Sequence, residues 1–574
     1  MPKKLSIMDH LLGIIENKKP SDRFILRALL FLTIASGIYF ALSVNNSFLI
    51  TTPARGGVLI EGIVGIPRFV NPALAITRAD QDTAALIYSG LMKIDEKGTL
   101  VPDLAENVTL GEDGLTYTII LKKNRAFHDE TPVTAKDVIF TINLMRDPDL
   151  KSPLRGNWND VTVIEVGEYE LTVTLAEAYA PFIENFIFGV MPEHIWSSLP
   201  IEQLPFSQYN TEPIGSGPFM ITKVNRDGSG LISGYNLRPA DQDEVEPNLA
   251  AIELKFFQNE ALLVTAFKNK EITSTIFLPS EAIAELNQEE IKVITEPLPR
   301  VFGIFFNQNR SVTLRDRAAR EALNVAINRD LLVAQVLDGF GVPTTKPIVT
   351  PHRALQSEDT AEEDNSTSTV RSPEEILQTG GWKKNQAGFW EKKLDGSNQI
   401  LSVTIRTGNS PLFQKTAEQV ADSWRKIGIG VQIEQYEQTG LVQSVIRSRD
   451  FEALLFGLDM NRLQDLYPFW HSSQKDDPGL NIAQYTNVNV DRLLEEARIS
   501  EDPAEQLRLL NETSKIIASE VPAIFLFGPS ISYVVNRDIS ASEMNMLGRP
   551  ADRFMNISNW HARTNVVWPI FEQN

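Results

Sequence analysis

The sequence predicts a mixed α/β and α+β protein that follows an N-terminal transmembrane helix. Three observations support this prediction. The chain of 574 residues is 43% apolar and 22% charged, which is ordinary for a globular protein. From Gly57 onward, β-type runs and amphipathic helical runs follow one another without strict alternation. A long apolar run, residues 24–44, stands ahead of them.

The apolar run FILRALLFLTIASGIYFALSV is interrupted only by Arg27, and a helix of about 20 residues spans a bilayer. Basic residues cluster before the run, whereas Arg55 is the only one between the run and Pro67. The positive-inside rule therefore predicts a single-pass cell-membrane protein with an extracytoplasmic C-terminal part. Its predicted segments are a cytoplasmic stretch 1–23, an anchor 24–44 and a tether 45–55.

Two other interpretations of residues 24–44 stay open. The run could be a cleaved signal peptide, with Ala41-Leu42-Ser43 as a weak cleavage site. It could also be a buried core helix. The long basic lead favours the membrane anchor over the signal peptide.

The bulk charge and the cysteine count exclude several functions. The formal net charge of −20 argues against a nucleic-acid partner, because phosphate contacts need clustered Lys and Arg. The absence of cysteine excludes disulfides, thiolate zinc sites, cysteine nucleophiles and a lipidated cysteine anchor.

Several elements can be placed from hydrophobic periodicity. Residues 108–123 read as a hairpin with GEDG as its turn, and 169–182 and 251–258 each contain a strand. Helical spacing runs through 315–337, and 416–436 reads as a helix, a glycine stop and a strand. Two helices divided near Asp502-Pro503 are predicted over 490–519, and the acidic, Ser/Thr-rich stretch 355–372 is predicted to be an exposed loop.

The densest group of catalytic-looking side chains is His128-Asp129-Glu130, which Asp137 follows closely. No metal-binding pair of histidines, nucleophile elbow or phosphate loop accompanies it in the sequence, so no metal or cofactor is predicted. Thr134 and Asp137 instead have the spacing of a helix capping box, with Val133 and Val138 as a hydrophobic staple. We therefore interpret this group as structural.

The order of motifs resembles family 5 of the solute-binding proteins of ABC importers, the oligopeptide, dipeptide and nickel-binding group. The resemblance covers roughly residues 56–535. It rests on a collinear series that includes IYSGLMKID (87–95), LTYTIILKKNRAFHDETPVTAKDVIFT (115–141), PIGSGPF (213–219), VFGIFFNQNRSVTLRDRAAREALNVAINRDLLV (301–333), GGWKK (380–384) and NVDRLLEEAR (489–498).

The resemblance implies a two-lobed periplasmic-binding-protein fold that closes on its ligand. Lobe I would comprise 56–299 with 525–574, including an extra subdomain at about 90–200, and lobe II would comprise 300–524. Glu130 departs from the family pattern, which has Gly there. We therefore expect the turn at Glu130 to avoid positive φ.

The resemblance also suggests ligand-binding residues. Arg406 lies where the dipeptide-binding branch has an Arg that meets the ligand carboxylate. Asp459 and Asp465 are candidates for the Asp that pairs with a peptide amino terminus, although Asn461 or Arg462 falls closer to that position. Further candidates for the pocket wall are Tyr467 and Trp470.

The leading functional hypothesis is a membrane-anchored binding protein without enzymatic activity. It would capture peptides or similar solutes and deliver them to the permease subunits of an ABC importer. A ligand-sensing receptor coupled to a membrane signalling partner is the alternative, and a glycosidase-type hydrolase is a third possibility.

Overall fold

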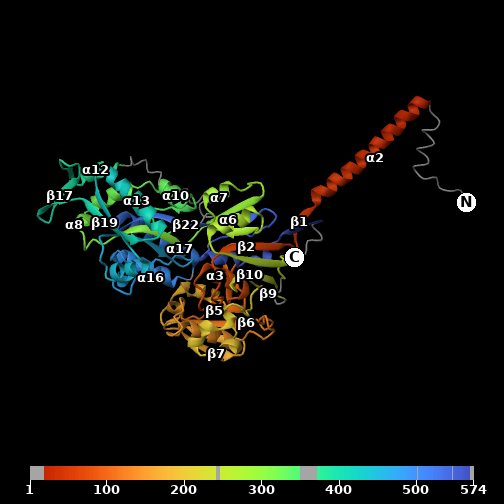
Figure 1. Ribbon diagram of the computed structural model, residues 1–574, viewed down its shortest axis with the longest axis horizontal. Helices are drawn as coiled ribbons and strands as arrows, with labels where there is room; N and C mark the ends of the chain where they lie inside the picture. Colours follow the sequence, from red (N-terminus) through yellow and green to blue (C-terminus); the bar gives the residue numbers. More distant parts are fainter. Residues whose placement is uncertain (1–18, 241–245, 350–370, 501, 546, 569–574) are drawn as a thin grey trace.

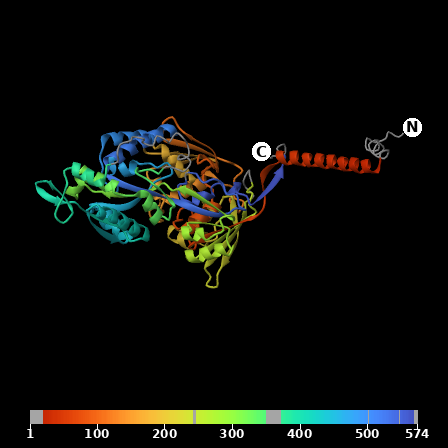
Figure 2. The same ribbon diagram turned by 90° about the horizontal axis from the view of Figure 1, so that it is seen from above.

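The computed structural model describes residues 19–240, 246–349, 371–500, 502–545 and 547–568. Helix α2 (Pro20–Phe48) projects away from the body of the molecule, which lies to one side of it (Figures 1 and 2). Its window Ala28–Asn45 is long and apolar enough to cross a membrane, and none of it is buried against the protein. The alternative of a buried core helix is therefore wrong.

One 12-stranded sheet runs through the body of the molecule. Its main path is β20-β19-β21-β14-β22-β12-β2-β11-β10-β9, and β13 and β15 also pair with β22. The bounds are β2 (Val58–Val64), β9 (Phe219–Arg226), β10 (Ile232–Pro239), β11 (Ala251–Phe257), β12 (Ser274–Ile276), β13 (Ile291–Pro297), β14 (Arg300–Phe306), β15 (Gly341–Pro343), β19 (Ser402–Gly408), β20 (Gly430–Tyr436), β21 (Ala453–Asp459) and β22 (Ala523–Asn536).

Strand β22 joins the two lobes. Its first part pairs with β14 and β15, and its second part pairs with β12 and β13. The buried cores divide at the same place. The lobe I cores use residues 59–298 and 531–560, whereas the lobe II cores use residues 301–527. The chain therefore crosses between the lobes near residue 300 and along the middle of β22.

Helices cover the sheet in both lobes (Figure 1). Those of lobe I are α3 (Arg78–Ile87), α4 (Ala135–Arg146), α5 (Glu193–Trp196), α6 (Glu260–Lys268) and α7 (Ser280–Ala284). Those of lobe II are α8 (Val312–Arg315), α9 (Arg317–Val325), α10 (Arg329–Val336), α12 (Pro373–Thr379), α13 (Pro411–Lys426), α14 (Gln438–Gly440), α15 (Tyr467–Trp470), α16 (Val488–Ile499) and α17 (Pro503–Glu520).

Small sheets complete the fold. A four-stranded sheet in order β5-β6-β8-β7 forms the lower part of lobe I in Figure 1. The predicted hairpin of 108–123 is its β5–β6 pair, closed by a bond from Gly111 N–H to the Thr116 carbonyl at 2.8 Å. The bounds are β3 (Met92–Ile94), β4 (Leu100–Pro102), β5 (Ala105–Leu110), β6 (Thr116–Leu121), β7 (Thr162–Gly167), β8 (Glu170–Thr174), β16 (Lys383–Lys384), β17 (Trp390–Leu394) and β18 (Ser397–Ile400).

The group around His128 is structural, as predicted. The capping box of α4 is present, and the Asp137 carboxylate accepts a bond from the Thr134 N–H at 2.8 Å. The stapling residues Val133 and Val138 are both buried. His128 bonds the carbonyl of Gly217 at 3.0 Å, which holds this turn against the segment before β9.

The expectation for Glu130 is wrong. This residue has φ of 70°, the left-handed conformation that favours glycine. Its N–H donates to the Phe127 carbonyl at 2.9 Å, so the turn between Phe127 and α4 is tight. The turn therefore has the backbone geometry that suits Gly, although its residue is Glu130.

Two sequence expectations differ from the structure at element boundaries. Residues 315–337 form two helices, α9 and α10, because Asn328 caps a new helix by accepting a bond from Leu331 N–H at 2.9 Å. The predicted tether 45–55 is instead the end of α2 and strand β1 (Ile50–Ala54), which pairs with β23 (Arg563–Val567). The predicted acidic loop lies almost entirely outside the described residues.

A buried charge cluster holds the C-terminal segment on lobe I. Arg553 bonds Glu61 on β2 and Asp82 on α3, each at 2.8 Å, and the three side chains are essentially inaccessible to solvent. A buried charge needs paired, hydrogen-bonded partners. This cluster therefore fixes residues 550–554 against the start of the lobe.

Candidate functional site

A pocket of about 610 Å³ lies in lobe II beside the first crossing between the lobes. Its lining includes Arg300, the first residue of β14, and Asp459, the last residue of β21. Its wall is mostly apolar and aromatic, and the rings of Phe413 and Phe456 stack with centroids 6.3 Å apart. The other lining residues are Phe302, Leu412, Gln438, Val442, Ile446, Gly457, Leu458, Phe469, Leu480 and Ile482. An apolar wall with a few polar groups is typical of a ligand pocket.

The pocket wall contains part of a strand with one unpaired edge. Strand β21 pairs with β14 along its whole length, but among the described residues its other neighbour, β19, pairs only with Ala453 and Leu454. The end of β21, from Phe456 to Asp459, therefore has backbone groups with no strand beside them, and it lines the pocket. Such an edge can accept an extended peptide as an added strand.

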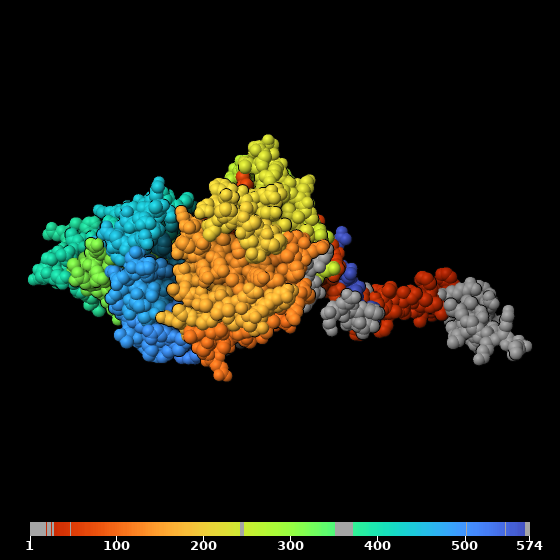
Figure 3. Space-filling model, turned by 90° about the horizontal axis from the view of Figure 1, so that it is seen from below, coloured from red at the N-terminus to blue at the C-terminus, as the bar shows by residue number. Residues whose placement is uncertain are grey.

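Polar contacts join the two lobes through residues that follow the end of β21 in the sequence. Arg462 of lobe II forms a bidentate ion pair with Glu184 of lobe I, and it also donates to the Gly98 carbonyl. Both side chains of the pair are about nine-tenths buried. Asn461 donates to the Tyr179 hydroxyl at 3.3 Å. In Figure 3 the blue surface of lobe II abuts the orange surface of lobe I. The polar contacts of Arg462 and Asn461 connect the two lobes at this boundary.

A stack of side chains extends this boundary. The Arg498 guanidinium lies 4.4 Å from the ring centroid of Tyr179 and 4.1 Å from that of Tyr467, so one cation touches aromatic rings of both lobes. Asp465 lies 3.6 Å from Arg498 and accepts a bond from the Tyr467 N–H at 3.0 Å. Burial raises the pKa of Asp465, against the opposing effect of Arg498.

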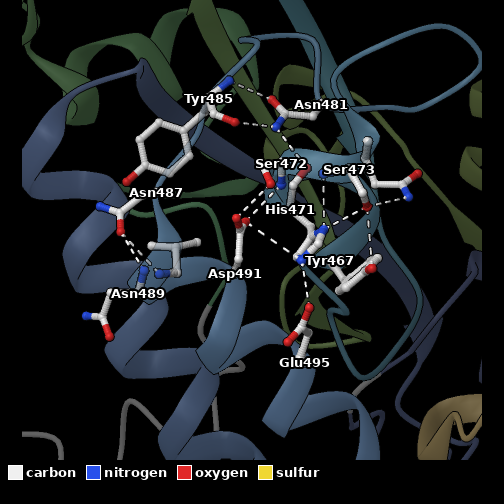
Figure 4. Close-up of polar contacts among 12 residues, drawn as sticks. Tyr467, His471, Ser472, Ser473, Asn481, Tyr485, Asn487, Asn489, Asp491 and Glu495 are labelled. Atoms are coloured by element: carbon white, nitrogen blue, oxygen red, sulfur yellow. Dashed lines mark hydrogen bonds and ion pairs between the residues drawn. The ribbon is translucent and has the colours of Figure 1, made fainter.

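Behind Tyr467 a hydrogen-bonded network orders the start of α16 (Figure 4). His471 stacks on Tyr467 at 4.1 Å and bonds Ser473 at 2.7 Å, while the Ser472 hydroxyl donates to Asp491 at 2.7 Å. The Ser472 hydroxyl is thus bonded to a carboxylate and the histidine ring is buried. The other ring nitrogen of His471 bonds Glu495 at 3.3 Å, so the network ties residues 471–473 to α16.

The predicted ligand residues occupy different environments. Asp459 lines the pocket and pairs with Arg300, and Asp465 and Tyr467 lie at the lobe boundary. Trp470 is fully buried in the lobe II core, where it contacts Phe305 and Phe525.

Arg406 lies on β19, where its guanidinium pairs with Glu434 at 2.8 Å and with Asp450 at 2.9 Å. Partial burial acts to lower the pKa of Arg406, but the bonds to Asp450 and Glu434 outweigh that effect and raise it. Arg406 is therefore already charge-compensated within lobe II.

Sequence reasoning missed Tyr179, Glu184, Arg498 and the aromatic pocket wall. Tyr179 and Glu184 lie in the segment AYAPFIENF (178–186), which carries no recognisable motif. Their partners are far away in the chain, since Arg462 and Glu184 are 278 residues apart. Only the paired charges of Glu184 and Arg462 could have suggested a contact, and the chain offers many such pairs.

Comparison with known proteins identifies the family of this chain. The family model for bacterial extracellular solute-binding proteins, family 5, matches residues 99–479, which is more than half of the chain. The chain belongs to this family. It is 27% identical over 516 residues to the oligopeptide-binding protein AppA of Bacillus subtilis, covering 88% of this chain and 92% of that protein.

Two solved structures share the fold. AppA of Bacillus subtilis in complex with a nonapeptide has a TM-score of 0.63 at 25% identity, covering 89% of this chain and 99% of that one. The protein AppA of Clostridium difficile has a TM-score of 0.70 at 21% identity, covering 88% of this chain and 100% of that one. The shared fold confirms the predicted two-lobed periplasmic-binding-protein architecture. Membership of family 5, a family of solute-binding proteins, makes this chain a binding protein and not an enzyme.

The geometry of this candidate site suits binding. The site combines an apolar pocket, a free strand edge and polar contacts between the lobes. These features can enclose a solute and shield it from solvent without making or breaking a covalent bond. Among the residues that the structure describes, no group of three or more His, Asp or Glu side chains could hold a metal ion.

Proposed function

We propose that this protein captures peptides between its two lobes and delivers them to the permease of an ABC importer, while α2 anchors it in the membrane. The observation that carries the peptide assignment is the free edge of β21 in the pocket wall. An extended peptide would bond to this edge through its backbone, and its side chains would enter the aromatic pocket. The named peptide ligands of similar proteins support the same class of solute.

The polar boundary would then close the site. Arg462 with Glu184, and Arg498 with Tyr179, contact across the lobes only when the lobes are together. A ligand that bridges the lobes favours the closed form by its differential affinity for that form. A permease would recognise the closed form.

Mass spectrometry of the molecules that co-purify with the full-length protein in detergent tests the ligand class. We expect mixed short peptides, because backbone pairing is tolerant of side chains. Recovery of only a sugar or a metal chelate would overturn the peptide assignment. Turnover of an added peptide or glycoside would favour a hydrolase, whereas a signalling receptor would bring a stable membrane partner other than a permease.

Arg406 has its own test as a carboxylate-binding residue. If it leaves Glu434 or Asp450 to bind the peptide carboxylate, Arg406→Ala will weaken peptide affinity by about tenfold or more, on the order of 1.5–3 kcal/mol for a charged hydrogen bond. Isothermal titration calorimetry with a defined peptide measures this change. Arg425→Ala, which removes an exposed Arg on α13, is the control. An unchanged affinity removes Arg406 from the site.

A further inference from the structure

The junction between α2 and lobe I is a small two-stranded sheet. Strand β1 begins two residues after α2 ends at Phe48, and it pairs along its whole length with β23, in register from Ile50 with Val567 to Ala54 with Arg563. Figures 1 and 2 show β1 at the end of the body from which α2 projects. The C-terminal part of the chain therefore returns to the point at which the helix begins its projection.

This sheet is attached firmly to lobe I. Just after β1, Arg55 pairs with Glu246, and the Gly56 N–H donates to the Asn248 carbonyl at 2.8 Å. At Gly57 a Cβ would come within 2.4 Å of the Cβ of Ala562, so the strand leading into β2 lies directly against the segment before β23. Only residues 55–57 separate β1 from β2, which leaves no flexible linker in the path from helix to lobe.

Aromatic and aliphatic side chains are exposed at the helix end of this sheet. The rings of Phe48 and Trp568 stack with centroids 5.9 Å apart and planes 9° apart. Phe48 is 55% exposed, Val566 61% and Trp568 39%. Exposed apolar residues are common singly, but here three gather at one end of a helix that is itself apolar.

The position of this group relative to the membrane follows from helix geometry. The apolar window of α2 ends at Asn45, and Phe48 comes three residues later in the same helix. At 1.5 Å per residue, Phe48 lies about 4–5 Å beyond the apolar window, at the level of the lipid headgroups. Trp side chains such as that of Trp568, which stacks on Phe48, concentrate at that level because their amphipathic rings suit the boundary between acyl chains and water.

We propose that Phe48, Val566 and Trp568 form a membrane-contact face that sits in the headgroup region of the bilayer crossed by α2. This inference rests on the proposed anchor. The C-terminal strand β23 gives lobe I a second contact with the membrane, besides the helix. Lobe I is thereby held at a fixed height and orientation, and lobe II moves relative to it when the site opens and closes.

Site-directed spin labelling of the full-length protein in lipid nanodiscs tests the proposal. Because the chain has no cysteine, each introduced cysteine carries the only label. Val566→Cys reports on the membrane-contact face, Ala35→Cys on the middle of α2, and Asn398→Cys on the β17–β18 hairpin, which lies at the opposite end of the molecule in Figure 1. Accessibility is measured to oxygen, which concentrates in lipid, and to a water-soluble nickel chelate.

We expect the oxygen-to-nickel accessibility ratio at position 566 to exceed that at 398 by about threefold and to fall below that at 35, as a headgroup depth requires. A water-like ratio at 566 with a lipid-like ratio at 35 would overturn the membrane-contact face and leave the anchor intact. A water-like ratio at 35 would instead overturn the anchor. Spin–spin broadening at 566 with low access to both reagents would show a second copy of the chain on this face, which also overturns the proposal.

A second measurement covers the case in which labelling disturbs the sheet. Oxidation of the Thr52→Cys, Asn565→Cys pair should cross-link the paired strands, whereas Thr52→Cys with Asn398→Cys should not. If the first pair forms no cross-link in the folded protein, β23 does not lie at the membrane end of the chain and the proposal fails.

Discussion

At the scale of single residues, Glu130 shows how a turn geometry can persist without the residue that suits it. It adopts φ of 70° in the tight turn before α4, and its side chain is exposed. A residue with a Cβ is strained in this region, and each such position costs on the order of 1–3 kcal/mol. The surrounding contacts of His128 and the α4 cap hold the turn in place.

The strain at Glu130 predicts that a glycine at this position stabilises the protein. The free energy of unfolding of the Glu130→Gly variant should be about 1 kcal/mol higher than that of the Glu130→Ala variant, because Gly relieves the strain and Ala retains the Cβ. Urea denaturation of the two variants, followed by tryptophan fluorescence, measures this difference. Equal stabilities would mean that the turn is not strained in solution.

At the scale of elements, local signals predicted most of what the chain forms. The hairpin β5–β6, the α4 capping box and the division between α16 and α17 at Asp502 were predicted, because turn and cap residues lie next to the elements they end. The break between α9 and α10 was missed, because apolar spacing continues through it while Asn328 starts a new cap.

The cap of α10 gives a direct test of that break. Asn328→Ala should lower the free energy of unfolding by about 1 kcal/mol, because Leu331 N–H loses its side-chain acceptor. Gln335→Ala, an exposed change late in the same helix, is the control and should have a smaller effect. If both variants unfold at the same urea concentration as the parent protein, the cap contributes nothing and the two helices are separated for another reason.

At the scale of the whole molecule, the two lobes share strand β22 and meet again through polar side chains. The two-lobed architecture could be expected from the collinear motifs, but the boundary contacts could not. Arg462 and Glu184, and Arg498 and Tyr179, lie hundreds of residues apart, and no local pattern marks them. The predicted residues Asp465 and Tyr467 lie at the same boundary, in contact with Arg498.

We predict that the Arg462–Glu184 pair stabilises the closed form of the two lobes. Glu184→Gln removes the negative partner of the buried Arg462. This change destabilises the closed form, in which the unpaired charge is buried, but not the open form, in which water solvates the Arg. Small-angle X-ray scattering of the ligand-free variant should therefore show a larger radius of gyration than the parent protein. Glu177→Gln, an exposed change seven residues earlier in the chain, should not alter it. An unchanged radius for Glu184→Gln would show that the pair does not govern closure.

The central claim is that the ligand is held between the lobes, and locking the boundary tests it most directly. In this cysteine-free chain, Tyr179→Cys and Asn461→Cys place one thiol on each side of the boundary, within reach of a short bismaleimide. A labelled peptide bound before cross-linking should be retained through extensive dialysis, and a peptide added after cross-linking should fail to bind. Free exchange of the peptide in the cross-linked protein would contradict a site between the lobes.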